Sequence, residues 1–380
     1  MKLLEQKVVF LITSLALGGA ETQLYYLATS LKQRGWDVKV VSMCAPQAFA
    51  KELHDNGILV YSLDIPKGVL DWKALFRLVR ILKQEKPSIL HGHMVHANLL
   101  ARLVRLFVPI PVVVCTAHNI CEGGRHRNEW YRLTDFLCDM TTQVSEAGLT
   151  RYVEERMVDP QKAVFLPNGV NTAVFKKDPI SRQRGRAALN VNHDFVWLAA
   201  GRFEEAKDYP NMIHAFASLF RKDPRNILLI VGEGSLRPQM ETLANELGVG
   251  HRIKFLELQK NMPGMMNVAD AYVMASAWEG MPMVLLEAAA CELPIVATDV
   301  GGNREVVLDG KTGFIVSAKK PEDLARSMET LTAMSEDRRL FMGQEGRRYI
   351  KEKYDLNFVT GAWEDLYYRL LDKKKSHDKR

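Results

Sequence analysis

The sequence predicts an α/β protein with two doubly wound domains, each a parallel sheet covered by helices. Three observations lead to this prediction. Short β-branched runs alternate with helical patterns along the chain, which is typical of parallel sheets joined by helices. These runs are apolar almost without interruption, as strands buried on both faces must be. The chain has 380 residues, whereas one domain usually takes about 150, so we expect two domains.

Apolar runs place six strands in each half of the chain. In the first half they are residues 8–13, 38–43, 88–93, 111–118, 141–145 and 163–169. In the second half they are residues 195–201, 226–232, 253–258, 271–276, 294–299 and 313–316. Between the two sets, residues 174–190 are polar and charged without a strand pattern, so we place the linker there. The predicted parts are an N-terminal domain, a C-terminal domain, a terminal helix and a basic tail, at residues 1–175, 186–355, 356–372 and 373–380.

Composition and charge limit the classes of function. The formal net charge is +6, and residues 372–380 alone supply half of it. The rest of the chain is mildly basic, which favours phosphate-bearing substrates or an anionic membrane surface, and no nucleic-acid partner is expected. Five cysteines without a C-x-x-C pair favour a reducing cytoplasm over a disulfide framework. Arg102 and Arg105 interrupt the longest apolar run, and we interpret residues 1–20 as a strand and turn rather than a signal peptide.

Two glycines follow the first predicted strand. Gly18 and Gly19 let the backbone approach a ligand closely, and a helix expected from near Glu21 points its partial positive charge toward an anion. The spacing is not G-x-G-x-x-G, so a dinucleotide cofactor is not indicated. A plain turn is the competing interpretation.

Histidines end two strands of the first half. His118 lies at a strand end, where doubly wound domains bind their ligands. A packed or solvated histidine is the competing interpretation. His91, His93 and His96 lie close together and raise the question of a metal site. No cysteine or carboxylate accompanies them at metal-ligand spacing, and alternation along a strand explains His91 and His93 equally well, so we expect no metal.

A cationic loop follows the first strand of the second half. Arg202 and Lys207 lie there, before a helix expected from near Pro210. Two cations beside a helix N-terminus suit a diphosphate, whose negative charge grows as it leaves a sugar carbon. A solvated basic loop is the alternative.

Two glutamates stand out in the mostly apolar stretch 276–302. We expect a turn at residues 279–282 and then a helix with Pro282 in its first turn. Glu279 then lies in the turn, and Glu287 lies in the first turns of the helix. Carboxylates are strong acceptors for paired hydroxyls, so two of them suit a ligand such as ribose plus hexose. Both could instead cap the helix dipole, but Glu287 lies too deep for that role.

Together these motifs resemble those of the family-four retaining glycosyltransferases of the GT-B fold, in which two Rossmann-like domains face a central cleft. The resemblance covers nearly the whole chain. It is carried by GGAE at 18–21, HN at 118–119, PNGV at 167–170, GRFEEAKDYPN at 201–211, VGEG at 231–234 and the block from SAWEG to REVV at 276–307. Two departures bear on local turns: Glu292 stands where such sequences usually carry glycine, and the segment 255–263 lacks the usual glycine after its strand.

The resemblance implies roles for the C-terminal residues. Glu279 would contact the hydroxyls of the donor sugar, Glu287 would hold the ribose, and Arg202 with Lys207 would bind the diphosphate. The turn after Glu279 would complete the nucleotide-sugar site, with Gly280, Met281, Pro282 and Met283.

It also implies roles for the N-terminal domain, which would bind the acceptor. Gly18 and Gly19 would add phosphate contacts, and His118 would lie beside the transferred sugar. The terminal helix would cross back to this domain.

The same pattern defines an expected activity. The chain has no D-x-D triplet, the pair with which metal-dependent sugar transferases hold a divalent ion, so cations would replace the metal. We expect a metal-independent hexosyltransferase without a cofactor, acting on a UDP-linked hexose or N-acetylhexosamine, with GDP-mannose as the second choice. By analogy alone, the acceptor is a bacterial surface glycan on a lipid carrier. The alternatives are a hydrolase, epimerase or phosphorylase acting on sugar nucleotides, or a non-catalytic binding protein.

Two helices have informative apolar patterns. In residues 71–86, Leu75, Val79 and Leu82 share one face and basic residues surround the other, so the helix either packs on its own sheet or lies on anionic lipid at the inner face of the membrane. In the terminal helix, a four-residue spacing predicts one buried stripe, made of Phe358, Ala362, Leu366 and Leu370.

Overall fold

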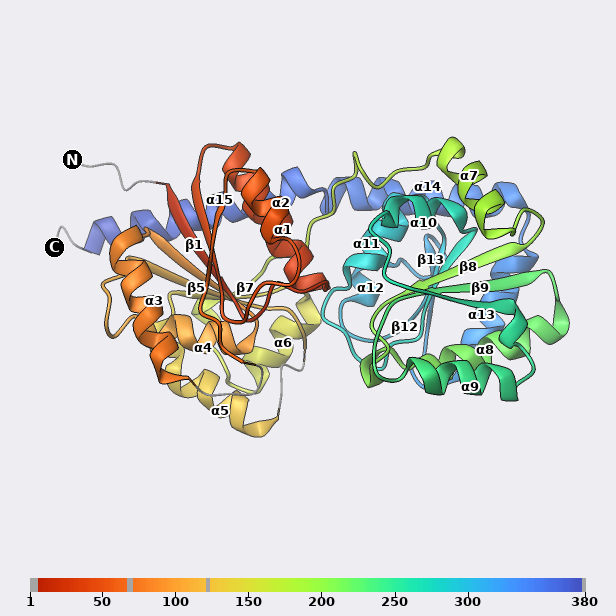
Figure 1. Cartoon of the computed structure of the whole chain (residues 1–380), viewed down its shortest axis with the longest axis horizontal. Coiled ribbons are helices and arrows are strands. Elements are labelled where there is room, and N and C mark those ends of the chain that lie inside the picture. Colours follow the sequence, from red (N-terminus) through yellow and green to blue (C-terminus); the bar gives the residue numbers. More distant parts are fainter. Residues whose placement is uncertain (1–5, 67–70, 121–123, 378–380) are drawn as a thin grey trace. The chain divides into compact units, whose positions relative to one another are not determined.

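Each half of the chain forms its own parallel sheet, which confirms the predicted fold class (Figure 1). The computed structural model describes residues 6–66, 71–120 and 124–377. The chain divides into two compact units. Unit 1 comprises Met1–Gly169 together with Leu356–Arg380, and unit 2 comprises Val170–Asp355.

Unit 1 contains a seven-stranded sheet in the order β3-β2-β1-β4-β5-β6-β7, in which all neighbours are parallel. Its strands are β1 (Lys7–Ile12), β2 (Asp37–Ser42), β3 (Leu59–Ser62), β4 (Ile89–His93), β5 (Val112–Ala117), β6 (Met140–Gln143) and β7 (Ala163–Phe165). Its helices are α1 (Gly19–Gln33), α2 (Ala50–Asp55), α3 (Trp72–Glu85), α4 (Val95–Val104), α5 (Arg125–Thr134), α6 (Glu146–Glu154), α15 (Leu356–His377) and the short 3-10 helices η1 (Asp135–Leu137) and η2 (Pro160–Lys162).

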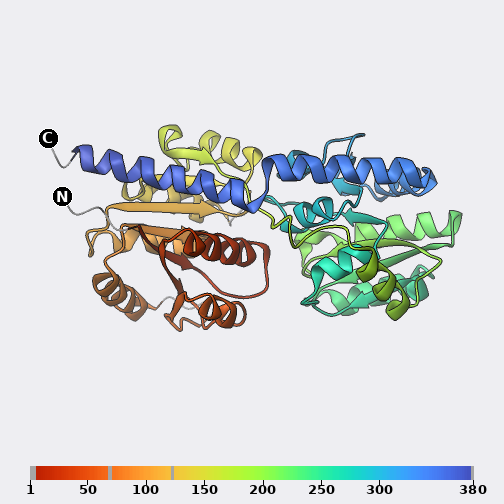
Figure 2. The same ribbon diagram turned by 90° about the horizontal axis from the view of Figure 1, so that it is seen from above.

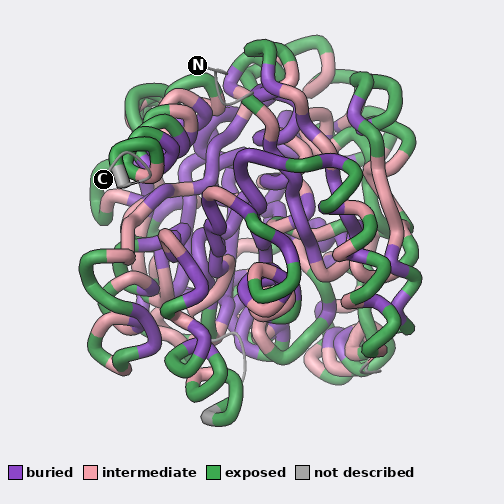
Figure 3. Tube along the Cα trace, turned by 90° about the vertical axis from the view of Figure 1, so that its left-hand side faces the viewer, coloured by how far each residue is buried: buried purple, intermediate pink, exposed green. Residues whose placement is uncertain are grey.

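The strands of unit 1 bury both of their faces, because side chains alternate along each strand. Phe10 of β1 packs with α1 and α15, whereas its neighbour Leu11 packs with α3 and α4. Strands such as β1 and β5 are accordingly buried along nearly their whole length (Figure 3). Because both faces of these strands are buried, the strands appear in the sequence as continuous apolar runs.

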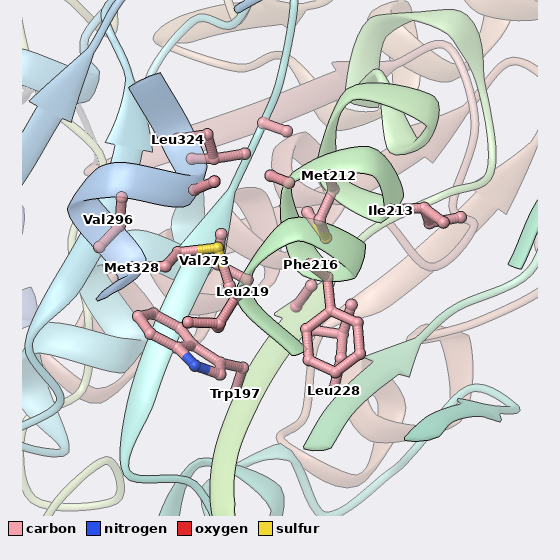
Figure 4. Close-up of a cluster of buried hydrophobic side chains, with 14 of the residues drawn as sticks. Trp197, Met212, Ile213, Phe216, Leu219, Leu228, Val273, Val296, Leu324 and Met328 are labelled. Carbon is pink, nitrogen blue, oxygen red and sulfur yellow. The ribbon is translucent and has the colours of Figure 1, made fainter. Parts of the chain in front are cut away.

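Unit 2 contains a six-stranded parallel sheet in the order β10-β9-β8-β11-β12-β13. Its strands are β8 (Phe195–Ala200), β9 (Asn226–Val231), β10 (Ile253–Leu256), β11 (Ala271–Met274), β12 (Ile295–Thr298) and β13 (Gly313–Val316). Its helices are α7 (Pro179–Leu189), α8 (Tyr209–Lys222), α9 (Arg237–Glu246), α10 (Met262–Val268), α11 (Met283–Ala290), α12 (Asn303–Val306), α13 (Pro321–Ala333), α14 (Glu336–Lys353) and the 3-10 helices η3 (Glu205–Lys207) and η4 (Gly250–Arg252). Trp197 of β8 and Phe216 of α8 belong to one core cluster on this sheet (Figure 4).

All twelve predicted strands form, and the structure adds β3, which the sequence analysis does not predict. β3 lies at the edge of its sheet and, among the residues that the structure describes, pairs only with β2. Its residues are half-buried or exposed, and Leu59 is 44% exposed. A short edge strand lacks the continuous apolar run that burial on both faces requires, so the pattern that marks the other strands is missing.

The predicted linker at 174–190 differs from the structure. Helix α7 occupies most of this stretch, and the boundary between the units lies at Gly169 and Val170. The segment is a helix because Asp178 caps it, accepting hydrogen bonds from the backbone of Ile180 and Ser181, and Pro179 fits the first turn. Its polarity reflects a surface helix rather than a linker.

The terminal helix α15 packs against the sheet and α1 of unit 1 (Figure 2). Its predicted stripe is partly wrong, because Phe358 is 60% exposed. The buried apolar residues are Val359, Trp363, Leu366, Tyr367, Leu370 and Leu371, which follow the usual three- and four-residue spacing of a helix rather than four alone. The helix also continues to His377, so the predicted tail begins as its last turn.

Helix α3 packs on its own sheet, through a face shifted by one residue from the predicted one. Ala74, Leu78 and Leu82 are buried, whereas Leu75 and Val79 are only half-buried. Alanine is small, so the sequence did not mark position 74 as buried. In the structure Ala74 is buried between the helix and the sheet.

Candidate active site

The strand order of unit 2 reverses between β8 and β11, which are direct neighbours. In doubly wound sheets the loops that leave the carboxyl ends of such a pair diverge, and ligands bind in the crevice between them. The two loops here are residues 201–208 and 275–282. They contain most of the side chains that the sequence analysis singles out in the second half.

Lys207 and Glu279 form an ion pair that joins these two loops. The Lys207 Nζ lies 2.5 Å from the Glu279 Oε1, and the Ser276 hydroxyl donates a hydrogen bond to the same oxygen at 2.7 Å. The carboxylate is buried, and the lysine side chain is 22% exposed. The sequence placed both residues at this edge, but neither their contact nor the role of Ser276 was predicted. A strand-end serine three residues before a glutamate is too common a pattern to signal this.

Arg202 is not joined to this pair. Its side chain is 65% exposed, and its guanidinium lies 3.3 Å from the Glu204 carboxylate. The predicted pair of cations is therefore one half-buried lysine, held in place by Glu279, and one solvated arginine. An ion pair at such an exposed position is weak, so Glu204 holds Arg202 less firmly than Glu279 holds Lys207.

The turn after Glu279 is held by the loop that follows β12. Gly302 donates its backbone N–H to the Gly280 carbonyl at 2.6 Å, and the Thr298 hydroxyl donates to the Ser276 carbonyl at 2.7 Å. Gly301 has a positive φ of 56°, and a Cβ there would lie 2.3 Å from the Glu279 carbonyl oxygen. Only glycine fits this close approach. The D-V-G-G sequence was a visible signal of such a turn.

The rest of this turn is buried and leads directly into α11. Pro282 precedes the helix rather than lying inside its first turn, and Met281 and Met283 are buried on either side of it. Because α11 begins at the carboxyl edge of the sheet, its unpaired backbone N–H groups lie at this same edge. Helix α8, which begins at Tyr209, contributes a second N-terminus there.

Glu287 lies in the second turn of α11 and is 6% exposed. Burial raises the pKa of its carboxyl group to about 7. A buried carboxylate gains from hydroxyl donors that satisfy its oxygens, so this side chain suits a ligand with paired hydroxyls. The depth of Glu287 in the helix was predicted correctly from the sequence, but the change in its protonation was not.

The raised pKa of Glu287 predicts a pH dependence of stability. The folded state holds this proton up to about pH 7, whereas the unfolded carboxyl loses it near 4.5. The stabilising effect of the neutral carboxyl is therefore complete below pH 4.5 and is lost as the pH rises through 7. The wild type should therefore lose up to about 3 kcal/mol in the free energy of unfolding as Glu287 ionises. The variant Glu287→Gln cannot ionise and should not show this loss.

Denaturant unfolding at pH 5 and pH 8 measures this effect. The control is Glu292→Gln, since Glu292 also lies beside α11 but is ion-paired with Lys177 at 3.8 Å. The wild type and the control should lose more stability than Glu287→Gln between the two pH values. Equal losses in all three proteins would contradict the ionisation of a buried Glu287.

In unit 1 the strand order reverses between β1 and β4, and the predicted glycines follow β1. Helix α1 begins at Gly19, two residues earlier than expected, and Gly18 precedes it. The Glu21 carboxylate folds back against Gly18, where a Cβ would lie 2.5 Å from its Oε2, and Ser14 donates to the other oxygen at 3.1 Å. An anion at this helix N-terminus would therefore meet a carboxylate as well as backbone N–H groups.

His118 follows β5 and lies beside the histidines of β4. Its Nε2 is 2.8 Å from the Nδ1 of His93, and the two rings are stacked with centroids 5.1 Å apart. Burial lowers the pKa of His118 to about 4, so the ring is neutral at physiological pH. The position of His118 at the strand end was predicted from the sequence, but its contact with His93 was not.

A cavity of about 490 Å³ lies at the opposite end of the unit 2 sheet, near the amino ends of its strands. Many of its charged lining residues are already paired with one another, as Arg182 is with Asp270 and Arg225 with Asp223. The carboxyl edge carries the more specific chemistry, and we place the candidate site there.

Neither a metal-ligand cluster nor a membrane-spanning helix is found in the part of the chain that the structure describes. No group of three or more histidine, cysteine, aspartate or glutamate residues there has an arrangement that could hold a metal ion. Within the same residues, no helix combines the length and the apolar character needed to cross a membrane.

Comparison with known proteins agrees with this geometry. Residues 17–174 match the family described as Glycosyltransferase Family 4, and residues 181–349 match Glycosyl transferases group 1. The crystal structure of Anabaena HepE in complex with UDP and glucose superimposes with a TM-score of 0.86 at 20% sequence identity, covering 96% of this chain and 99% of that one. The fold is GT-B, and the chain belongs to the family-four glycosyltransferases.

Two curated relatives illustrate the range of the family. The UDP-Gal:alpha-D-GlcNAc-diphosphoundecaprenol alpha-1,3-galactosyltransferase of Escherichia coli is 24% identical over 80% of this chain and 81% of its own length. A GDP-mannose-dependent phosphatidylinositol monomannoside mannosyltransferase of Mycolicibacterium smegmatis is 31% identical over 54% of this chain and 57% of its own length. Both are named as glycosyltransferases, and they differ in the nucleotide of the donor.

Proposed function

We propose that this glycosyltransferase moves a hexose or N-acetylhexosamine from a UDP-linked sugar to a glycan or lipid-linked glycan acceptor, with retention of anomeric configuration. The observation that carries the proposal is the Lys207–Glu279 ion pair. It lies where the strand order of the unit 2 sheet reverses, between β8 and β11. It sets a cation and a carboxylate side by side at the sheet edge where a nucleotide sugar would bind.

The chemistry follows from what each group can stabilise. When the bond between sugar and diphosphate breaks, negative charge grows on the diphosphate and positive charge on the sugar. Lys207, with the N-termini of α8 and α11, would stabilise the diphosphate, and Arg202 would swing in from solvent to join it. Glu279 would orient Lys207 and accept hydrogen bonds from the sugar hydroxyls. The turn at Gly280–Met283 would supply backbone N–H groups, and Glu287 would hold the ribose.

The donor and acceptor proposals rest partly on the relatives. UDP is named in the galactosyltransferase relative and in the HepE complex, and GDP-mannose in the mannosyltransferase relatives. The acceptor named in the galactosyltransferase relative is a sugar on a diphosphoundecaprenol carrier. UDP is therefore our first choice of nucleotide, and a lipid-linked glycan our first choice of acceptor.

We further propose that no divalent metal is required and that the protein works in the cytoplasm. Lys207 and the two helix N-termini would take over the charge stabilisation that a metal gives to other sugar transferases. The cysteines that the structure describes, Cys44, Cys115, Cys138 and Cys291, are free thiols, which fits a reducing compartment.

A screen of nucleotide sugars for thermal stabilisation, followed by an assay of sugar release, tests the activity. UDP-hexoses or UDP-N-acetylhexosamines should raise the melting temperature more than GDP-mannose and should be turned over when an acceptor is added. Release of sugar to water alone, with every lipid-linked acceptor inert, would favour a hydrolase instead. Binding without turnover would favour a non-catalytic protein.

The surface of α3 supports a peripheral contact with the inner face of the membrane. Trp72 and Phe76 are 69% and 68% exposed although they are aromatic. Lys73, Arg80 and Lys83 are exposed on the same helix. Exposed aromatic residues among lysines and arginines suit an anionic lipid surface, because the rings enter the headgroup layer and the cations attract phosphate.

Flotation with anionic vesicles tests this contact. The wild type should float with the vesicles at low salt and separate from them at high salt. Trp72→Ser with Phe76→Ser should weaken the association by about ten-fold or more, because both rings lose their burial in lipid. Phe341→Ser is the matched control, since Phe341 is 53% exposed but lies on α14 of unit 2. Absence of salt-sensitive flotation in the wild type would remove the membrane proposal.

A further inference from the structure

Three buried polar side chains connect the carboxyl ends of β11 and β12 in unit 2. Ser276, Thr298 and Asn303 are each 0% exposed. The Asn303 Nδ2 donates to the Thr298 carbonyl at 2.9 Å, and the Thr298 hydroxyl donates to the Ser276 carbonyl at 2.7 Å. The Ser276 hydroxyl then donates to the Glu279 Oε1 at 2.7 Å. These contacts therefore end on the carboxylate of the candidate site.

The backbone of this turn is held without the Ser276 hydroxyl. Thr298 binds the carbonyl of Ser276, which any residue at this position would supply. The Ala277 N–H donates to the Ala206 carbonyl at 2.8 Å, so the two loops of the site are also joined through backbone groups alone. Among the described residues, the side chain of Ser276 has its hydrogen bond with Glu279. Alanine at position 276 would keep the backbone contacts and lose the contact with the carboxylate.

Both side-chain contacts of Glu279 end on the same carboxylate oxygen. The Lys207 Nζ lies 2.5 Å from Oε1, and the Ser276 Oγ lies 2.7 Å from that atom. Among the described residues, Oε2 receives no hydrogen bond and is not one of the buried atoms that lack a partner, so solvent reaches it. Because an ionised carboxylate accepts hydrogen bonds at both oxygens, Oε2 is the acceptor that a ligand can use.

Two donors on one oxygen fix the plane of the carboxylate. The last torsion of a glutamate side chain has a broad, roughly two-fold preference, so a single donor would leave the two oxygens free to exchange. The Lys207 ammonium is a compact charge with rotatable N–H groups, and by itself it defines no plane. The buried Ser276 hydroxyl adds a second, fixed direction on Oε1.

From this geometry we infer that Ser276 is a positioning residue for Glu279. Its hydroxyl orients the carboxylate so that Oε1 is committed to Lys207 and Oε2 is presented to the ligand. An ammonium has three N–H groups, so Lys207 can donate to Oε1 and still donate to an anion. The use of Oε2 by a hydroxyl of the donor sugar rests on the proposed function.

Crystal structures of the full-length wild type and of Ser276→Ala test the positioning without any substrate. In the wild type, Lys207 and Ser276 should both lie within hydrogen-bond distance of one oxygen of Glu279. In Ser276→Ala the carboxylate should turn so that both of its oxygens approach the Lys207 ammonium. An unchanged carboxylate orientation in this variant would overturn the inference. If Ser276→Ala does not fold, a wild-type Ser276 hydroxyl that points away from Glu279 would overturn it equally.

Steady-state kinetics with varied donor test the consequence for the reaction. Ser276→Ala should lower kcat by about ten-fold with little change in donor KM, because it removes a hydrogen bond to a charged group that acts on the sugar in the transition state. Ser42→Ala is the matched control. Ser42 of unit 1 is also 0% exposed, and its hydroxyl donates at 2.6 Å to the Cys44 carbonyl. This control should keep the kcat of the wild type.

A double-mutant cycle separates positioning of the carboxylate from support of the loop. If Ser276 acts through Glu279, Ser276→Ala should cause little further loss of kcat in a protein that already carries Glu279→Ala. Equal losses of kcat with and without Glu279 would contradict the positioning role. A wild type that shows the shared Oε1 contact but transfers no sugar would contradict the proposed function and leave this inference intact.

Discussion

Replacing Lys207 with alanine is expected to lower kcat by about 100-fold or more, because it removes a preorganised cation from the departing diphosphate. The loss should fall mainly on kcat rather than on donor KM, since the charge on the diphosphate grows only as the bond breaks. Steady-state kinetics with varied donor at saturating acceptor measure both constants. An undiminished kcat would show that Lys207 does not face the diphosphate.

Arg202→Ala is the matched control for this experiment. Arg202 lies in the same loop but is 65% exposed and is ion-paired with Glu204, so its loss should cost less than that of Lys207. Glu279→Ala should also lower kcat, because it removes both the carboxylate near the sugar and the partner that orients Lys207. Since these two side chains touch, the double variant should lose less than the product of the two single losses. Strictly multiplicative losses would mean that the ion pair is not part of the working site.

The second large effect is expected on nucleotide binding. Glu287→Ala should weaken the binding of the free nucleoside diphosphate by about 10- to 100-fold, because two hydrogen bonds between the ribose hydroxyls and the Glu287 carboxyl group are lost. The ribose is unchanged during transfer, so kcat at saturating donor should remain close to that of the wild type. Isothermal titration calorimetry with the nucleoside diphosphate, alongside kinetics with varied donor, separates the two effects.

Glu292→Gln serves as the control for Glu287, because it changes a carboxylate beside the same helix that is ion-paired with Lys177. Its nucleotide affinity should match that of the wild type. Normal nucleotide binding by Glu287→Ala would show that this carboxylate is assigned wrongly and that its burial serves packing alone.

Most of the fold could be predicted from the sequence because its strands are buried on both faces. A short, continuous apolar run rich in isoleucine and valine, such as residues 226–232, is typical of a buried parallel strand. The edge strand β3 lacks this signal, and the polar helix α7 could not be told from a linker by composition alone. The buried face of α15 was misplaced because a strict four-residue spacing drifts around a helix that turns every 3.6 residues.

The candidate site was predicted less completely than the fold. Strand ends and glycines placed Lys207, Glu279 and His118 at the carboxyl edges of their sheets. The contacts between side chains were not predictable, since the Lys207–Glu279 pair and the His93–His118 pair each join segments from different strands. The exposure of these side chains could not be predicted either. Arg202 and Lys207 are both cations in the same loop, but Arg202 is solvated whereas Lys207 is ion-paired with the Glu279 carboxylate.

The anomeric form of the product made in the presence of chelator tests the proposed site most directly. Proton NMR would follow the first sugar released or transferred from an α-linked nucleotide sugar in excess EDTA. If Lys207 and the helix N-termini replace a metal and the reaction retains configuration, the α-product should form at the same rate with and without chelator. A β-product, or a loss of activity in EDTA that Mg²⁺ restores, would contradict a metal-free, retaining transferase.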